Sequence, residues 1–117
     1  MVEELCDWLN EEVVLSRRVE GEAGLRVGFR SGWLLCELLH RHNQLDGLAA
    51  LSDDDKSESV VAALGCARPV LERLGVRFPA SRAQQLLEGR PGAAAALLLE
   101  VRGRLRALGK RRWAEGP

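Results

Sequence analysis

The chain has 117 residues with 17 basic and 17 acidic side chains, so its formal charge is zero, and 46% of its residues are hydrophobic. This length fits one domain and excludes a two-domain enzyme, while the composition is that of a globular protein and not of a disordered one. Because its uncharged stretches are far shorter than the roughly 20 apolar residues of a membrane-spanning helix, we expect no transmembrane segment.

The first predicted helix spans Val2 to Leu15. Apolar residues recur there at helical spacing, at Leu5, Trp8, Leu9 and Val13, and acidic residues near its start favour the positive end of the helix dipole. Secretory and mitochondrial leaders are basic, so this acidic start does not match one. We therefore expect the protein in the cytoplasm. The next segment, Ser16 to Gly28, contains three glycines and is predicted to be a connection with at most one helical turn.

The segment FRSGWLLCELLHRH, residues 29–42, is predicted to be the central helix. Apolar residues cover most of its sides, which is typical of a helix enclosed by others. Gly32 is expected one turn inside this helix, where its missing side chain lets a neighbouring helix approach closely. Trp8 and Trp33 are interpreted as core residues whose indole N–H reaches a polar edge.

An acidic run, Ser52 to Asp55, precedes the next predicted helix, which is expected to begin near Asp55. Serine and aspartate are interpreted there as caps of a solvated helix start, in preference to a weak calcium site. Gly65 and Pro69 are expected to divide this region into two short helices, because proline lacks an amide donor. Gly75 is predicted to end the second of them.

The C-terminal part is predicted to contain a short helix and a long one. Val76 to Pro79 is expected to be extended, Ser81 to cap the short helix and Gly89 to end it. Pro91 stands in the position that proline tolerates at a helix start, and is predicted to open a helix that runs to about Arg112.

No segment shows the alternating pattern of a strand, so the predicted fold is all-α. We expect a compact globule of about four main helices plus short connecting helices, with the last helix packed along the buried central helix, residues 29–42. Residues 1–110 are expected to form the domain, and residues 111–117 a basic tail or the start of a linker.

Neither catalysis nor binding of a metal or cofactor is predicted. Cys6, Cys36 and Cys66 lack the paired spacing of a zinc site and are interpreted as small buried hydrophobic residues. His40 and His42 stand two apart on a helix, so they do not share a face and form no relay. His40 is expected at the end or rim of that helix. No nucleophile-elbow or phosphate-loop sequence is present.

Charge is distributed unevenly along the chain. Residues 1–60 carry 13 acidic and 6 basic side chains, a net charge of −7, and residues 61–117 carry 4 acidic and 11 basic ones, a net charge of +7. Between Val101 and Ala114 there are six cations and no acid. This run predicts either a site for an acidic partner or a soluble helix end whose cations interact with the helix dipole, and both interpretations stay open.

Four features occur together in the order of a known family. LCDWLNEEVVLSRRV is followed by FRSGWLLCELLHRH, a variable acidic loop, and RPVLERLGVRFPASRAQQLLEGRPGAAAALLLEVRGRL. Trp8, Phe29, the pair of Ser31 and Gly32, and the leucines of the central helix stand at the positions that carry the pattern. From about Val2 to Leu108 the chain resembles the calponin-homology domain, in the divergent form found in sperm-flagellar and axonemal proteins.

The resemblance implies a non-enzymatic cytoskeletal adaptor domain of a ciliary or flagellar protein. Its implied location is the cytoplasm, the cytoskeleton and the axoneme of the cilium or flagellum, and its implied partners are microtubules, through tubulin, or an axonemal protein. The basic surface expected to make the contact comprises Arg17, Arg18, Arg102, Arg106, Lys110, Arg111 and Arg112. The sequence does not distinguish this hypothesis from docking to another helical domain through apolar residues near Trp113.

Actin binding and nucleic-acid binding are the alternatives. Actin ranks lower because Ser57 to Val61 lacks the asparagine–tryptophan pair of many calponin-homology domains, and because no second tandem domain is present. Nucleic acid ranks lower because Trp113, at the end of the basic run, is the only aromatic residue there to stack on a base. No membrane partner is expected.

Overall fold

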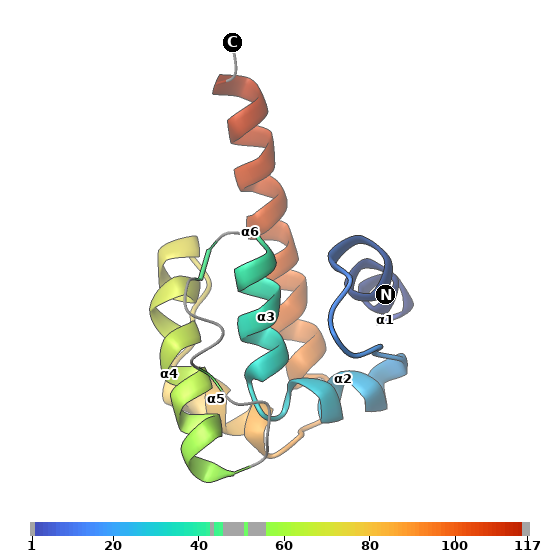
Figure 1. The fold of residues 1–117 in the computed structure, drawn as a ribbon, viewed down its shortest axis with the longest axis vertical. Coiled ribbons are helices and arrows are strands. Elements are labelled where there is room, and N and C mark those ends of the chain that lie inside the picture. Colours follow the sequence, from blue (N-terminus) through green and yellow to red (C-terminus); the bar gives the residue numbers. More distant parts are fainter. Residues whose placement is uncertain (1, 43, 46–50, 52–55, 116–117) are drawn as a thin grey trace.

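The computed structural model describes the backbone of residues 2–42, 44–45, 51 and 56–115, and the side chains of these residues up to 108. This part of the chain forms α1 (Val2–Asp7), a π-helix η1 (Trp8–Val13), α2 (Gly21–Phe29), α3 (Trp33–Arg41), α4 (Ser57–Leu74), α5 (Ala80–Leu87) and α6 (Ala93–Glu115). It contains no strand, which confirms the predicted all-α class. Figure 1 shows α4 on one side of α3, α1 on the other, and α6 running past both.

The N-terminal segment is helical from Val2 to Val13, as predicted, but its second half is a π-helix. The backbone N–H groups of Val14 and Leu15 both donate to the carbonyl of Leu9. Val14 ends the element with a φ of 57°, a left-handed conformation that β-branched residues rarely adopt. The turn out of η1 is therefore strained at an exposed residue.

Side chains hold the connection between η1 and α2. Asn10 Nδ2 donates to the Val19 carbonyl at 2.7 Å, and the Val19 N–H donates to Asn10 Oδ1 at 2.8 Å. The buried carboxylate of Glu37 on α3 accepts the N–H of Ser16 at 2.8 Å. These bonds satisfy backbone groups that no helix or strand pairs, and so direct the chain from η1 back to α2.

The prediction of a mere connection over Ser16 to Gly28 is wrong, because α2 begins at Gly21 within it. Leu25 is buried on the core face of α2, and Gly28 lies close to α3, because a Cβ there would stand 3.1 Å from Leu34 Cδ1. Tertiary packing therefore overrides the low helix propensity of glycine. Glu22 Oε1 also accepts the Gly92 N–H at 2.8 Å, which ties α2 to the start of α6.

The central helix is shorter than predicted, since Phe29 ends α2 and α3 begins only at Trp33. Gly32 therefore lies at the N-cap of α3 and not one turn inside it, and its φ of 82° forms the sharp turn between the two helices. The expected close approach is present nevertheless. A Cβ at Gly32 would stand 2.9 Å from Leu64 Cδ2, so glycine lets α4 pack against the start of α3.

Residues 57–74 form one helix, α4, so the prediction of two short helices divided at Gly65 and Pro69 is wrong. Proline removes the hydrogen bond to the carbonyl four residues earlier, which here belongs to Gly65. Both residues lie on the exposed face of α4, where water can replace the missing donor. Gly75 ends the helix as predicted, with a φ of 91°. The predicted caps at Ser52 to Asp55 lie outside the described residues.

The last two helices begin close to their predicted positions. The N-cap of α5 is Pro79, whose carbonyl accepts the N–H groups of Arg82 and Ala83, and not Ser81, which lies inside the helix. The N–H of Ala96 donates to the carbonyl of Gly92, so α6 begins two residues later than the predicted start at Pro91. The closest backbone approaches of α6 are to α1, α2, α4 and α5.

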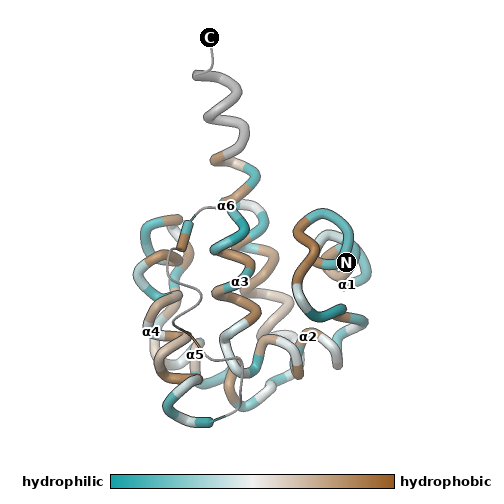
Figure 2. Tube along the Cα trace, viewed as in Figure 1, coloured by the Kyte–Doolittle hydropathy of each residue, from teal (hydrophilic) through white to brown (hydrophobic). Residues whose placement is uncertain are grey.

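All helices contribute to one core. Its largest fully buried side chains are Phe29, Leu5, Leu9, Leu25, Leu34, Leu35, Leu38, Leu39, Leu71, Leu97, Leu98 and Val19. Six consecutive residues of α3, Leu34 to Leu39, are buried, which confirms a buried central helix. Hydrophobic and hydrophilic stretches alternate along the helices in Figure 2, as expected for elements with one buried face.

Candidate partner-binding surface

The cysteine and histidine side chains have structural roles. Cys36 is buried and its Sγ lies 3.1 Å from the Ala63 carbonyl, and burial raises the pKa of its thiol to about 12. Cys6 is buried as well, whereas Cys66 is exposed, contrary to the prediction, because it lies outside the apolar stripe of α4. His40 and His42 place Nδ1 at 2.8 and 2.9 Å from the carbonyls of Leu45 and Leu38, at the end of α3, where His40 was expected.

Within the described part of the chain, no three histidine, cysteine, aspartate or glutamate side chains are grouped so that they could hold a metal ion. The helices in that part are also too short or too polar to cross a bilayer. Every buried side-chain nitrogen or oxygen there has a hydrogen-bond partner. The side-chain nitrogen and oxygen atoms of this part that lack a hydrogen-bond partner therefore lie at the surface.

Two of the predicted arginines, Arg102 and Arg106, line a cleft between α6 and the N-terminal helices. Its other lining residues are Glu4, Asp7, Trp8, Glu11 and Glu12, and its volume is about 410 Å³. Arg106 lies 4.0 Å from a carboxylate oxygen of Glu12. In this mixed-charge cleft, acidic residues of the first half of the chain face basic residues of the second half.

Arg17 and Arg18 follow η1 and do not line the mixed-charge cleft. Arg18 Nε donates to Glu20 Oε1 at 2.7 Å, and this bond, together with the nearby negative charge of Glu20 and Glu11, raises the pKa of the Arg18 guanidinium. Both arginines are exposed. The structure therefore brings only part of the predicted basic set together.

Lys110, Arg111 and Arg112 lie on the backbone of α6, which is helical to Glu115. Their side chains are outside the described part of the structure. Their contribution to the surface thus stays a prediction from the sequence.

A second group of cations lies on another side of α6. Arg73 and Arg104 line a small hollow of about 100 Å³ with Leu74, Ala107 and Leu108, and none of its described lining residues is acidic. The Arg104 guanidinium packs over Gly75, where α4 ends and its dipole favours a cation. Arg73 is held by a hydrogen bond of 2.8 Å from Nη2 to the Gln44 carbonyl. We call this pair the α4–α6 basic site.

The sequence analysis missed the α4–α6 basic site. Arg104 belongs to the basic run but was not part of the predicted surface, and Arg73 was not predicted to bind a partner. A signal was present in the spacing, because residues two apart on a helix point to different sides, which separates Arg104 from Arg102 and Arg106. Arg73 stands in the last turn of α4, next to the predicted terminator Gly75.

Comparison with known proteins places these observations in a family. The model of a CH-like domain in sperm protein matches residues 5–103. Over 101 residues the chain is 34% identical to sperm flagellar protein 2 of Homo sapiens, 33% to that of Sus scrofa and 32% to that of Rattus norvegicus. These alignments cover 86% of this chain and 6% of each relative, so the chain spans 6% of their length. No solved structure matches the chain.

Proposed function

The chain belongs to the family of CH-like domains in sperm protein, and we propose that it is a non-enzymatic adaptor domain of the flagellar cytoskeleton. In this proposal residues 1–110 form a rigid docking domain, residues 111–117 a basic extension, and a basic surface binds microtubules or an axonemal partner protein. Support comes from the names of the relatives, which are sperm flagellar proteins, and from a fold whose inner polar groups are already paired.

The α4–α6 basic site carries the proposal. Arg73 and Arg104 present two cations on helices that the core holds in place, and no carboxylate of the described side chains lines the hollow between them. An acidic protein surface such as that of tubulin supplies the missing negative charge. Such complementarity accelerates association and selects partners, and it weakens as salt screens the charges.

The other predicted arginines have a smaller part in this contact. Arg102 and Arg106 already face four carboxylates in the mixed-charge cleft, and Arg18 is paired with Glu20. These cations, with Arg17, Lys110, Arg111 and Arg112, add to the field around the domain within a Debye length of about 10 Å. An acidic partner therefore meets the α4–α6 basic site first.

Sedimentation of the domain with taxol-stabilised microtubules across a salt series tests the proposal. Binding is expected at low salt and is expected to fall as salt rises. Replacing Arg73 and Arg104 together by Gln is expected to weaken binding about tenfold or more, since each lost charge pair costs on the order of 1 kcal/mol at a partly exposed interface. Glutamine keeps the helix propensity and much of the side-chain length.

The matched control replaces Arg102 and Arg106 by Gln, which removes the same charge from the neighbouring side of α6. This control is expected to retain most of the binding. If the wild-type domain stays out of the pellet at low salt, direct tubulin binding is wrong and an axonemal protein is the partner to seek. Equal losses in the two variants would contradict the assignment to the α4–α6 basic site.

A further inference from the structure

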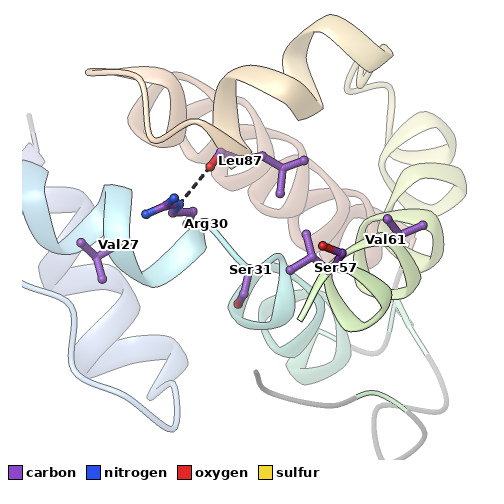
Figure 3. A pocket seen from close by; sticks show the side chains of 7 residues that line it. Val27, Arg30, Ser31, Ser57, Val61 and Leu87 are labelled. Carbon is purple, nitrogen blue, oxygen red and sulfur yellow. Dashed lines mark hydrogen bonds between the residues drawn. The ribbon is translucent and has the colours of Figure 1, made fainter. Parts of the chain in front are cut away.

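A third hollow lies between the end of α2, the start of α4 and the end of α5. Its volume is about 410 Å³, and it is lined by Val27, Arg30, Ser31, Ser57, Val60, Val61 and Leu87. Pockets that hold small ligands or side chains occupy roughly 300 to 1,000 Å³, so this interhelical pocket is large enough for an aliphatic side chain and its neighbours. Figure 3 shows Val27 on α2, Ser57 and Val61 on α4 and Leu87 at the end of α5, with Arg30 and Ser31 on the connection that follows α2.

The walls of the interhelical pocket are aliphatic and unusually exposed. Val27 is 72% and Val61 is 69% exposed, and they are two of the three large hydrophobic residues among the described ones whose side chains are exposed to solvent. The third, Val14, is at the strained turn after η1. Single exposed aliphatic residues are common in proteins, but two that flank one hollow indicate a contact surface.

Among the residues that the structure describes, Arg30 is the one charged residue in the lining of this pocket. Its Nε donates to the Leu87 carbonyl at 3.0 Å, drawn as the dashed line in Figure 3, and this is the bond that the structure gives the side chain. The bond fixes the guanidinium at the rim through Nε, so the two terminal nitrogens can donate to a ligand that accepts two hydrogen bonds. A carboxylate matches that fork and is bound most strongly in the bidentate form.

We propose that the interhelical pocket docks a partner-protein segment in which an aliphatic side chain is flanked by a carboxylate. The aliphatic side chain lies between Val27, Val61 and Leu87, and the carboxylate binds Arg30. The hydroxyl groups of Ser31 and Ser57 border the pocket and offer further hydrogen bonds to the segment's backbone. This site is separate from the α4–α6 basic site and does not rest on the function proposed for it.

A second copy of this chain does not meet the same requirement. In a twofold contact of this face with itself, each Arg30 meets a lining whose described residues include no carboxylate. The cation then loses water without gaining a partner, which costs free energy. Charge complementarity therefore favours an acidic segment of another protein over self-association.

The test uses nuclear magnetic resonance of the methyl-labelled chain titrated with the capped peptide acetyl-Asp-Leu-Leu-Asp-amide. The methyl signals of Val27, Val61 and Leu87 are expected to shift together as one binding isotherm. The isosteric peptide acetyl-Asn-Leu-Leu-Asn-amide is expected to bind about tenfold more weakly, because a hydrogen bond to a charged group is worth more than one to a neutral group.

Two variants and two matched controls locate the contact. Arg30→Gln is expected to weaken the acidic peptide about tenfold and to remove its advantage over the neutral one. Val61→Gln is expected to weaken both peptides equally. The controls, Arg77→Gln and Val14→Gln, change an exposed cation and an exposed valine that are absent from the pocket lining, and are expected to leave binding unchanged.

The proposal is overturned if the three methyl signals do not shift at millimolar peptide, or if both peptides bind equally to the wild-type chain. It is likewise overturned if Arg77→Gln weakens binding as much as Arg30→Gln does, since the carboxylate then binds elsewhere. Shifts of the same signals with protein concentration alone would identify a second copy as the occupant.

Discussion

Two contacts between helices in this molecule are built in opposite ways. Where α3 meets α4, Gly32 removes a side chain so that Leu64 can approach, and the thiol of Cys36 lies 3.1 Å from the Ala63 carbonyl. Where α6 meets η1, the outer edge is a cleft of exposed charges in which Arg106 lies 4.0 Å from Glu12. The first contact depends on shape and excludes water, whereas the edge of the second remains wet.

The α3–α4 contact therefore contributes to the stability of the fold, whereas the mixed-charge cleft contributes exposed charges to the surface. A contact that depends on close packing tolerates no added volume, and neither salt nor an acidic partner acts on it directly. Exposed ion pairs contribute little to folding, because solvent and salt screen them. We therefore expect changes at the α3–α4 contact to alter folding, and changes in the mixed-charge cleft to alter mainly the response to salt.

The largest expected effect is the protection of the Cys36 thiol. Burial raises its pKa from 9.0 to about 12, so near pH 8 the reactive thiolate is about a thousandfold rarer than in the unfolded chain. Iodoacetamide is expected to alkylate exposed Cys66 in the native protein and to reach Cys36 only after unfolding, as mass spectrometry of the digested protein would show. Rapid labelling of Cys36 in the native state would mean that the α3–α4 contact opens.

The same pKa gives a pH dependence of stability. Between pH 9 and about 12 the thiol stays protonated in the folded state but ionises in the unfolded state. The contribution of Cys36 to the free energy of unfolding is therefore complete below pH 9 and is lost as the pH rises toward about 12. The variant Cys36→Ser lacks this group, so it should lose less stability over that range. Urea titrations at two pH values, one on each side of 9, measure the difference.

Gly32→Ala is the next largest change. A methyl group there would stand 2.9 Å from Leu64 Cδ2 on a backbone whose φ is 82°. We expect a loss of about 2 to 4 kcal/mol in the free energy of unfolding, from the left-handed backbone and the overpacking together. The control Gly103→Ala lies in an exposed part of α6 with open space around it, and should gain about 0.5 to 1 kcal/mol.

A smaller loss is expected for Asn10→Ala, which removes both hydrogen bonds to the backbone of Val19. Leaving these groups without partners should cost about 2 kcal/mol in the free energy of unfolding measured by urea titration. Asn10→Asp keeps the acceptor and loses the donor, so an intermediate loss is expected. If Asn10→Ala proves as stable as the wild type, water replaces the carboxamide and the connection is not fixed by it.

The smallest effect belongs to the mixed-charge cleft. The side chains of Arg106 and Glu12 are 57% and 66% exposed, so Arg106→Gln should change the free energy of unfolding by less than about 0.5 kcal/mol. Any difference from the wild type should vanish at high salt, which parallel urea titrations at two salt concentrations can detect. A loss comparable to that of Gly32→Ala would erase the distinction between the two contacts.

Helical periodicity predicted the segments whose structure depends on one apolar face, including η1 as part of the first helix and the buried centre of α3. It failed where contacts distant in sequence decide the outcome. The glycines of α2 indicated a loop, because the sequence pattern does not show the packing of α2 against α3, where a Cβ added at Gly28 would stand 3.1 Å from Leu34 Cδ1. Pro69 indicated a break because the pattern does not show that it faces water.

The candidate surface was predictable in its charge and not in its geometry. The run of cations near the C-terminus is visible in the sequence, and so is the acidic first half. That Arg106 meets Glu12 while Arg104 meets the end of α4 depends on how α6 packs between the two. The interhelical pocket was not foreseen, because Val27 lies in the segment that was predicted to be a connection.

Pro69 gives α4 an unusual order of local opening. Most helices fray from their ends, but here the amide that would bind the Gly65 carbonyl is missing from the middle, while Gly75 and the Leu71 carbonyl close the C-terminal turn. Amide protons around the middle of α4 should therefore exchange with deuterium sooner than those of its last turn.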